Sequence, residues 1–113
     1  MSDVSPSQAD TIVIGGGIIG CSTAYHLAAL GCRDVVVLER SKLTSGTTWH
    51  SAALVRQLRS TIALTQLTQY SARLYASLAR ETGQETGWHR CGSLSIATNP
   101  DRHTHIRRQA SLA

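Results

Sequence analysis

Three glycines near the start of the chain have the spacing of a dinucleotide-binding turn. Gly15, Gly17 and Gly20 form the pattern G-x-G-x-x-G. Such glycines allow a tight turn, a close approach of the backbone to a pyrophosphate, and close packing of a helix on a strand. Glu39 follows Gly20 by nineteen residues, the distance at which an acidic side chain accepts hydrogen bonds from adenosine ribose hydroxyls. These residues predict a site for the ADP part of a dinucleotide.

The segments around these residues predict the elements that would position them. Residues 11–14 (TIVI) form a short apolar run before the glycines, which indicates a strand buried on both faces. Apolar residues then recur at helical spacing from Ile18 to Leu30, and Gly31 offers a C-cap. Residues 35–38 (VVVL) give a second buried strand. Strand, helix and strand in this order predict an α/β fold with a Rossmann-like βαβ unit.

Downstream of residue 40 the sequence predicts a loop and then a long helix. Residues 41–51 (SKLTSGTTWHS) are rich in Ser, Thr and Gly, which indicates a loop. A helix is expected from about residue 59 to 81, with Gly83 and Gly87 ending it. The residues expected along one face of this helix are Leu64, Leu67, Ser71, Leu74, Tyr75 and Leu78.

The last part of the chain predicts a strand and a helix. Residues 92–98 alternate small or polar residues with Leu94 and Ile96, which is typical of a half-buried strand. Asn99 then has the character of an N-cap, with Pro100 at the first helical position. The chain ends within this helix without a C-cap signal, so we expect an amino-terminal fragment of a larger protein.

The composition favours a folded chain and argues against several other classes. Of the 113 residues, 42% are hydrophobic and 16% are charged. The formal net charge is +4, but the Arg residues are scattered, so nucleic-acid binding is not indicated. The three cysteines lack CxxC spacing, so the sequence predicts neither a metal site nor a disulfide framework and favours a cytoplasmic location. No signal peptide or transmembrane segment is predicted.

Three stretches of the sequence resemble a known family. TIVIGGGIIGCSTAYHLAALG, VVVLER and TSGTTWHSAALV resemble the amino-terminal end of the D-amino-acid-oxidase superfamily of FAD-dependent oxidoreductases. TSGTTWHSA and TGWHRCGSLSIAT are most similar to the sarcosine and dimethylglycine dehydrogenases within it. The resemblance implies a larger two-domain flavoprotein. Residues 1–9 would be a polar tail, 10–60 the FAD-binding βαβ unit and flavin loop, and 61–113 the long helix and the start of a substrate domain.

The loop after the second strand suits the flavin side of FAD. Residues 45–48 (SGTT) supply hydroxyls and an unhindered backbone for the flavin-side phosphate and ribitol. The resemblance implies that His50 attaches the flavin covalently through an imidazole nitrogen, with a noncovalent contact as the alternative. Arg40 either lies over the adenine edge or points to solvent. The predicted cofactor-binding residues are Gly15, Gly17, Gly20, Glu39, Arg40, Ser45, Thr47, Thr48 and His50.

The resemblance also implies an activity. It is the oxidative demethylation of a small N-methylated amino acid such as sarcosine or dimethylglycine, by hydride transfer to flavin. The electron acceptor would be an electron-transfer flavoprotein, a quinone or oxygen, and a missing carboxy-terminal part could bind folate. Two alternatives remain open: another amine or amino-acid oxidase, and a non-enzymatic role like that of the pyruvate dehydrogenase phosphatase regulatory subunit. The catalytic residues are unknown and expected downstream, so this fragment alone should be inactive. Ala53 stands where the family usually has Gly, so its methyl group could crowd the flavin site.

Overall fold

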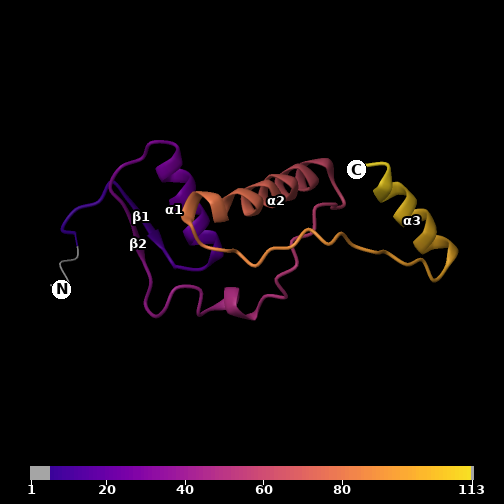
Figure 1. Ribbon diagram of the computed structural model, residues 1–113, viewed down its shortest axis with the longest axis horizontal. Helices are drawn as coiled ribbons and strands as arrows, with labels where there is room; N and C mark the ends of the chain where they lie inside the picture. Colours follow the sequence, from indigo (N-terminus) through magenta and orange to yellow (C-terminus); the bar gives the residue numbers. More distant parts are fainter. Residues whose placement is uncertain (1–5, 113) are drawn as a thin grey trace. The chain divides into compact units, whose positions relative to one another are not determined.

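Two short parallel strands form a sheet in the computed structural model, which describes residues 6–112. β1 (Thr11–Ile14) pairs with β2 (Val35–Leu38), and α1 (Ile18–Ala29) connects them. The helix packs against both strands (Figure 1). This arrangement confirms the predicted α/β fold class with a Rossmann-like unit.

The two faces of the sheet differ in their exposure. A Cβ atom placed on Gly20 of α1 would lie 3.4 Å from the Cγ1 atom of Val13, so this face lies under the helix. The side chains of Ile12, Ile14 and Leu38 are exposed on the strands. The expectation that both faces are buried is therefore wrong for the described residues, because a single helix covers a single face.

The end of α1 has the hydrogen bonds of a Schellman motif. The N–H of Gly31 donates to the carbonyl of Ala28, and the N–H of Cys32 donates to the carbonyl of Leu27, both at 3.0 Å. Gly31 has a φ of +90°, which glycine adopts without steric cost. It lies one residue beyond the C-cap, Leu30, so the predicted stop signal acts as expected.

The segment after β2 is the predicted loop of residues 41–51. It contains one turn of 3-10 helix, η1 (Thr47–His50), and otherwise only turns and bends. Such short turns are frequent in connections. The loop prediction is therefore correct apart from this single helical turn.

The longest helix, α2 (Ile62–Thr82), begins at residue 62 rather than near residue 59. Thr61 is its N-cap, and the Thr61 side chain accepts a hydrogen bond from the N–H of Leu64 at 3.3 Å. Such a cap satisfies a backbone donor of the first turn and fixes the start of the helix. Gly83 ends the helix with a φ of +71°, as predicted.

The face predicted for α2 is confirmed in part, because four of its six residues are half-buried: Ser71, Leu74, Tyr75 and Leu78. Leu64 and Leu67 are exposed, whereas Thr65 and Ala72 are buried. The Oγ1 atom of Thr65 accepts a hydrogen bond from the N–H of Arg59 at 3.1 Å, so the preceding segment covers this side of the helix. Apolar spacing alone could not indicate which side that segment would cover.

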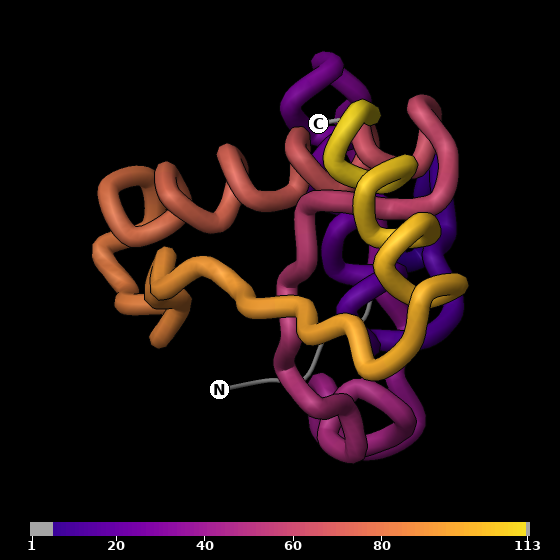
Figure 2. Tube along the Cα trace, turned by 90° about the vertical axis from the view of Figure 1, so that its right-hand side faces the viewer, coloured from indigo at the N-terminus to yellow at the C-terminus, as the bar shows by residue number. Residues whose placement is uncertain are grey.

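Residues 92–98 do not form the predicted strand. They are exposed along their whole length and run as an irregular segment toward α3 (Pro100–Ala110; Figure 2). A strand needs a neighbour for its backbone hydrogen bonds, and no other strand occurs among the described residues of this part. The predicted N-cap is confirmed, because the side chain of Asn99 accepts a hydrogen bond from the N–H of Arg102 at 2.8 Å.

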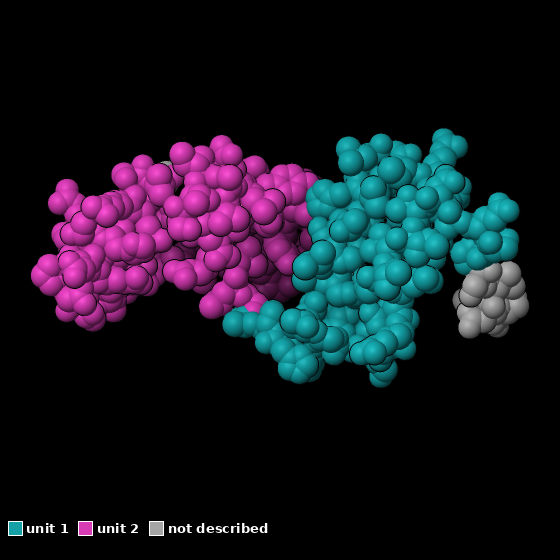
Figure 3. Space-filling model, turned by 180° about the vertical axis from the view of Figure 1, so that it is seen from behind, with its two compact units in different colours: residues 1–52 teal, residues 53–113 magenta. Residues whose placement is uncertain are grey.

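The chain divides into two compact units, residues 1–52 and 53–113 (Figure 3). The sequence placed this boundary after residue 60. The difference arises because the Oγ1 atom of Thr68 donates to the carbonyl of Gln57 at 2.6 Å, which ties the entering segment to α2. That residues 61–113 begin a substrate domain stays a prediction. No helix in the described part of the chain is long and apolar enough to cross a lipid bilayer.

Candidate functional site

The glycine turn joins β1 to α1 in a conformation that side chains would disturb. Gly15 has a φ of +104°, a region that favours glycine. Its N–H donates to the carbonyl of Leu38 at 2.8 Å, which keeps the turn at the edge of the sheet. A Cβ on Gly20 would overlap the carbonyl oxygen of Gly15. These two glycines therefore shape the turn and the helix–strand contact, as the fingerprint predicts.

The start of α1 presents backbone donors. Gly17 is the N-cap, with an extended backbone (φ −80°, ψ −177°), and Ile18 is the first helical residue. The first N–H groups of a helix have no acceptor within it and carry the positive end of the helix dipole. No acidic side chain lies in the first turn of α1. This end of the helix therefore suits an anionic group.

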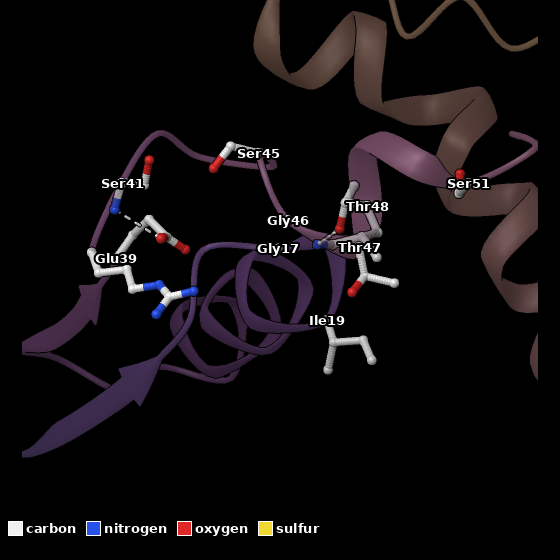
Figure 4. A pocket seen from close by; sticks show the side chains of 11 residues that line it. Gly17, Ile19, Glu39, Ser41, Ser45, Gly46, Thr47, Thr48 and Ser51 are labelled. Atoms are coloured by element: carbon white, nitrogen blue, oxygen red, sulfur yellow. Dashed lines mark hydrogen bonds between the residues drawn. The ribbon is translucent and has the colours of Figure 1, made fainter.

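Glu39, the residue after β2, is held by two backbone donors. Its Oε2 atom accepts from the N–H of Gly16 at 2.8 Å. Its Oε1 atom accepts from the N–H of Ser41 at 2.9 Å (Figure 4). The bond from Gly16, and next that from Ser41, lowers the pKa of the Glu39 carboxyl below its ordinary value, because both stabilise the charged form. Each oxygen retains acceptor capacity, so the carboxylate can still bind ligand hydroxyls.

The loop of residues 41–51 is attached to the glycine turn at two points. The N–H of Thr44 donates to the carbonyl of Gly16 at 2.9 Å. The Oγ1 atom of Thr48 accepts from the N–H of Ile18 at 2.9 Å (Figure 4). Because both bonds reach the same turn, the loop lies beside the N-terminus of α1.

A pocket of about 790 Å³ lies between the start of α1, the end of β2 and this loop (Figure 4). Six of the nine residues predicted to bind the cofactor line it, and the other three do not. The six predicted residues that line it are Gly17, Glu39, Arg40, Ser45, Thr47 and Thr48. The three that do not are Gly15, Gly20 and His50. Gly15 and Gly20 shape the backbone of the turn, and their contact with the cofactor stays a prediction.

His50 closes η1 and is exposed. Its Nδ1 atom lies 3.0 Å from the carbonyl oxygen of Gly46. A carbonyl oxygen only accepts hydrogen bonds, so Nδ1 carries the proton in the neutral ring. The Nε2 atom then has a free lone pair, which makes it the nucleophilic nitrogen of this side chain.

Sequence reasoning missed several residues of this site. Ser41, Ser51, Ile18 and Ile19 line the pocket, and Gly16 is buried beneath Glu39. Gly16 occupies a variable position of the fingerprint, and its signal was the run of three consecutive glycines. Ser41 contributes a backbone N–H, a group that every residue except proline supplies, so its identity carried no signal.

Other chemically capable side chains lie outside the pocket. The Nδ1 atom of His26 lies 2.6 Å from the carbonyl oxygen of Ser22, one turn earlier in α1. The Sγ atom of Cys21 contacts the carbonyl oxygen of Gly16 at 3.5 Å. No group of three or more His, Cys, Asp or Glu side chains able to hold a metal ion occurs within residues 6–112.

Comparison with known proteins identifies relatives over most of the chain. The family model DAO, described as FAD dependent oxidoreductase, matches residues 10–113. The chain is 48% identical to mitochondrial sarcosine dehydrogenase from Homo sapiens over 108 residues, 95% of this chain and 12% of that protein. It is 47% identical to mitochondrial dimethylglycine dehydrogenase from Rattus norvegicus over 102 residues, 90% of this chain and 12% of that protein.

A solved structure is also similar. The crystal structure of L-proline dehydrogenase from P. horikoshii matches with a TM-score of 0.85 and 26% sequence identity. The match covers 96% of this chain and 28% of that one. Because the chain spans only about 12% of the length of the two curated relatives, their activities apply to it as proposals.

Proposed function

Because this chain belongs to the DAO family of FAD-dependent oxidoreductases, we propose that its first unit binds the ADP half of FAD. We propose further that the whole protein oxidises a small N-methylated amine. One observation carries the proposal: the N-terminus of α1 and the Glu39 carboxylate line the same pocket. An ADP group needs donors for its pyrophosphate and an acceptor for its ribose hydroxyls.

The start of α1 fits the pyrophosphate. Gly17 has no side chain, and a Cβ there would come within 3.0 Å of the Oγ1 atom of Thr48. The glycine therefore leaves room for the Thr48 hydroxyl and places no side chain between the turn and a phosphate group. Ser45 and Thr47 line the same pocket and add hydroxyl donors on the loop side.

Glu39 fits the adenosine ribose. Its two backbone bonds fix the carboxylate and keep it charged at neutral pH. The remaining acceptor sites suit the two ribose hydroxyls. The same charge would repel a 2′-phosphate, which supports FAD over NADP. Arg40 lines the pocket next to Glu39 and is exposed. Its side chain is proposed either to contact the adenine edge or to point to solvent.

His50 is proposed to hold the flavin covalently through Nε2. Support comes from the hydrogen bond between its Nδ1 atom and the carbonyl of Gly46, which leaves Nε2 unprotonated in the neutral ring. A covalent bond would keep the ring in one position relative to the substrate.

When bound, FAD would supply the redox chemistry as the acceptor of a hydride from the N-methyl carbon of the amine, and hydrolysis of the resulting iminium would give amine and formaldehyde. The contribution of this chain is binding and orientation. We propose sarcosine or dimethylglycine as the substrate class, because the relatives named for these substrates are 48% and 47% identical. The electron acceptor is proposed to be an electron-transfer flavoprotein, a quinone or oxygen, and folate binding is proposed for a carboxy-terminal part.

An absorption spectrum of the whole purified protein tests the proposal. A bound flavin should be visible, and anaerobic addition of sarcosine or dimethylglycine should bleach it. Reoxidation by each acceptor class in turn then identifies the acceptor. A protein that contains no flavin would contradict the proposal and favour the regulatory role. A flavin bleached only by other amines would favour a different oxidase of the same family.

A further inference from the structure

The N-cap residue of α1 makes no side-chain hydrogen bond to the first turn of the helix. N-caps are usually Ser, Thr, Asp or Asn, whose side chains accept a hydrogen bond from the first turn. Here the N-cap is Gly17, which has no side chain. The Oγ1 atom of Thr48, thirty residues beyond Ile18, accepts the N–H of Ile18 at 2.9 Å instead. The turn requires glycine at residue 17, and the loop supplies the side-chain acceptor that this glycine lacks.

We infer that Thr48 is a remote N-cap of α1 and, through that bond, a positioning residue for the flavin loop (residues 41–51). The role in cofactor binding rests on the proposed function, whereas the capping role does not. Thr48 is half-buried, while its neighbours Thr47, Trp49 and His50 are exposed. Within η1 the Thr48 side chain is therefore the one bonded to α1.

The hydrogen bonds of η1 connect Thr48 to the rest of the loop, up to Ser51. The N–H of Ser51 donates to the carbonyl of Thr48 at 3.2 Å, and the N–H of Trp49 donates to the carbonyl of Gly46 at 3.1 Å. The His50 ring also binds the carbonyl of Gly46. Residues 46–51 therefore form one hydrogen-bonded turn, which the Thr48 hydroxyl attaches to α1.

A second bond holds the other end of the loop. The N–H of Thr44 donates to the carbonyl of Gly16 at 2.9 Å. Loss of the Thr48 hydroxyl would leave this bond intact and release η1. A loop that is ordered before its ligand arrives saves the entropy cost of ordering on binding. Removal of the hydroxyl should therefore weaken a ligand that contacts the whole loop more than one that contacts the glycine turn alone.

Thr48→Val and Thr48→Ser test this role in protein made cofactor-free by riboflavin limitation. Valine has the shape of threonine but no acceptor, whereas serine keeps the acceptor. Thr48→Val should raise the initial dissociation constant for FAD about tenfold, the effect of losing one cap, and that for ADP by clearly less. Thr48→Ser should restore both. Thr23→Val is the matched control, because the Thr23 hydroxyl bonds only to the carbonyl of Ile19 in α1.

Hydrogen exchange in the same cofactor-free proteins gives an independent measurement. In Thr48→Val the amides of Ile18, Trp49 and Ser51 should exchange faster than in the unmodified protein, and in Thr48→Ser they should not. Unchanged exchange would overturn the inference. Equal losses of ADP and FAD affinity would also overturn it, because they would mean that Thr48 only contacts the phosphate groups and does not position the loop. If the unmodified protein binds neither nucleotide, the proposed function fails, and the exchange rates still decide whether Thr48 caps α1.

Discussion

The carboxylate of Glu39 accepts a 2.8 Å hydrogen bond from the backbone N–H of Gly16, although 23 residues separate them in sequence. The contact is also steric, because a Cβ on Gly16 would lie 3.1 Å from the Cβ of Glu39. Glu39, the proposed ribose acceptor, therefore contacts the glycine turn, the proposed pyrophosphate site, directly. A change at either residue should affect both.

Glu39 should make stability depend on pH in acid. Its pKa is lowered from the ordinary value of 4.5, chiefly by the Gly16 bond. A carboxyl group with a depressed folded-state pKa stabilises the protein above its ordinary pKa, and this contribution is lost as pH falls through the folded-state value. The difference in free energy of unfolding between the unmodified protein and Glu39→Gln should therefore stay constant above pH 4.5 and shrink below pH 4.5. A difference that already shrinks above pH 4.5 would contradict the lowered pKa of Glu39.

Gly17→Val should abolish tight FAD binding. The branched side chain would enter the space between the Gly17 backbone and the Thr48 hydroxyl, where a single Cβ already comes within 3.0 Å. Ala28→Val, which adds the same side chain at an exposed position of α1, should leave the flavin content unchanged. The measurement is the ratio of flavin to protein absorbance after purification. Normal flavin content in Gly17→Val would remove the basis for placing the pyrophosphate there.

Gly20→Ala and Gly16→Ala should differ in their cost to stability. The new Cβ at residue 20 meets the backbone carbonyl of Gly15, which cannot move without opening the turn. At residue 16 the nearest atom is the flexible end of the Leu43 side chain, which can rotate away. Chemical unfolding should give a loss of about 3 kcal/mol for Gly20→Ala and about 1 kcal/mol for Gly16→Ala. Equal losses would mean that helix–strand packing does not depend on Gly20.

The βαβ unit could be predicted because its signals are local. Glycines at fixed spacing, an apolar run on each side and a glycine after α1 each act within a few residues. The partners of Glu39 could not be predicted, because both donors are backbone N–H groups. Backbone donors are common to almost all residue types. The anchoring of Thr48 could not be predicted either, since it depends on a bond to Ile18 across thirty residues.

The second unit was harder to predict. Leu64 and Leu67 have the correct spacing for a buried face, but these leucines are exposed. The segment before α2 instead contacts the side of the helix that carries Thr65, through the hydrogen bond from the N–H of Arg59. Residues 92–98 alternate like a strand, yet a strand exists only where another backbone accepts its hydrogen bonds. In both cases the missing information is which segment lies beside the element.

Ala53→Gly should stabilise the protein. Ala53 has a φ of +52°, and an L-residue with a side chain pays about 1–2 kcal/mol to adopt this left-handed conformation. Glycine removes that strain but adds unfolded-state entropy of about 0.4–1 kcal/mol, so the net gain should be about 1 kcal/mol in unfolding experiments. Ala52→Gly is the matched control, because no positive φ occurs there, and it should be destabilising. A loss of stability in Ala53→Gly would contradict the strain.

His50 should prove to be the covalent anchor of the flavin. Acid denaturation of the whole protein should leave yellow flavin attached to the polypeptide, and His50→Ala should release all of it. We expect activity to fall without vanishing, because Glu39 and the glycine turn would still bind FAD. A displacement of about 1 Å at the reacting atoms can reduce a rate about a hundredfold. Gly46 contributes only its carbonyl to the His50 ring, so Gly46→Ala, with open space around its Cβ, should retain the attachment. Free release of flavin from the unmodified protein by acid would rule out the covalent bond and leave His50 as a noncovalent contact.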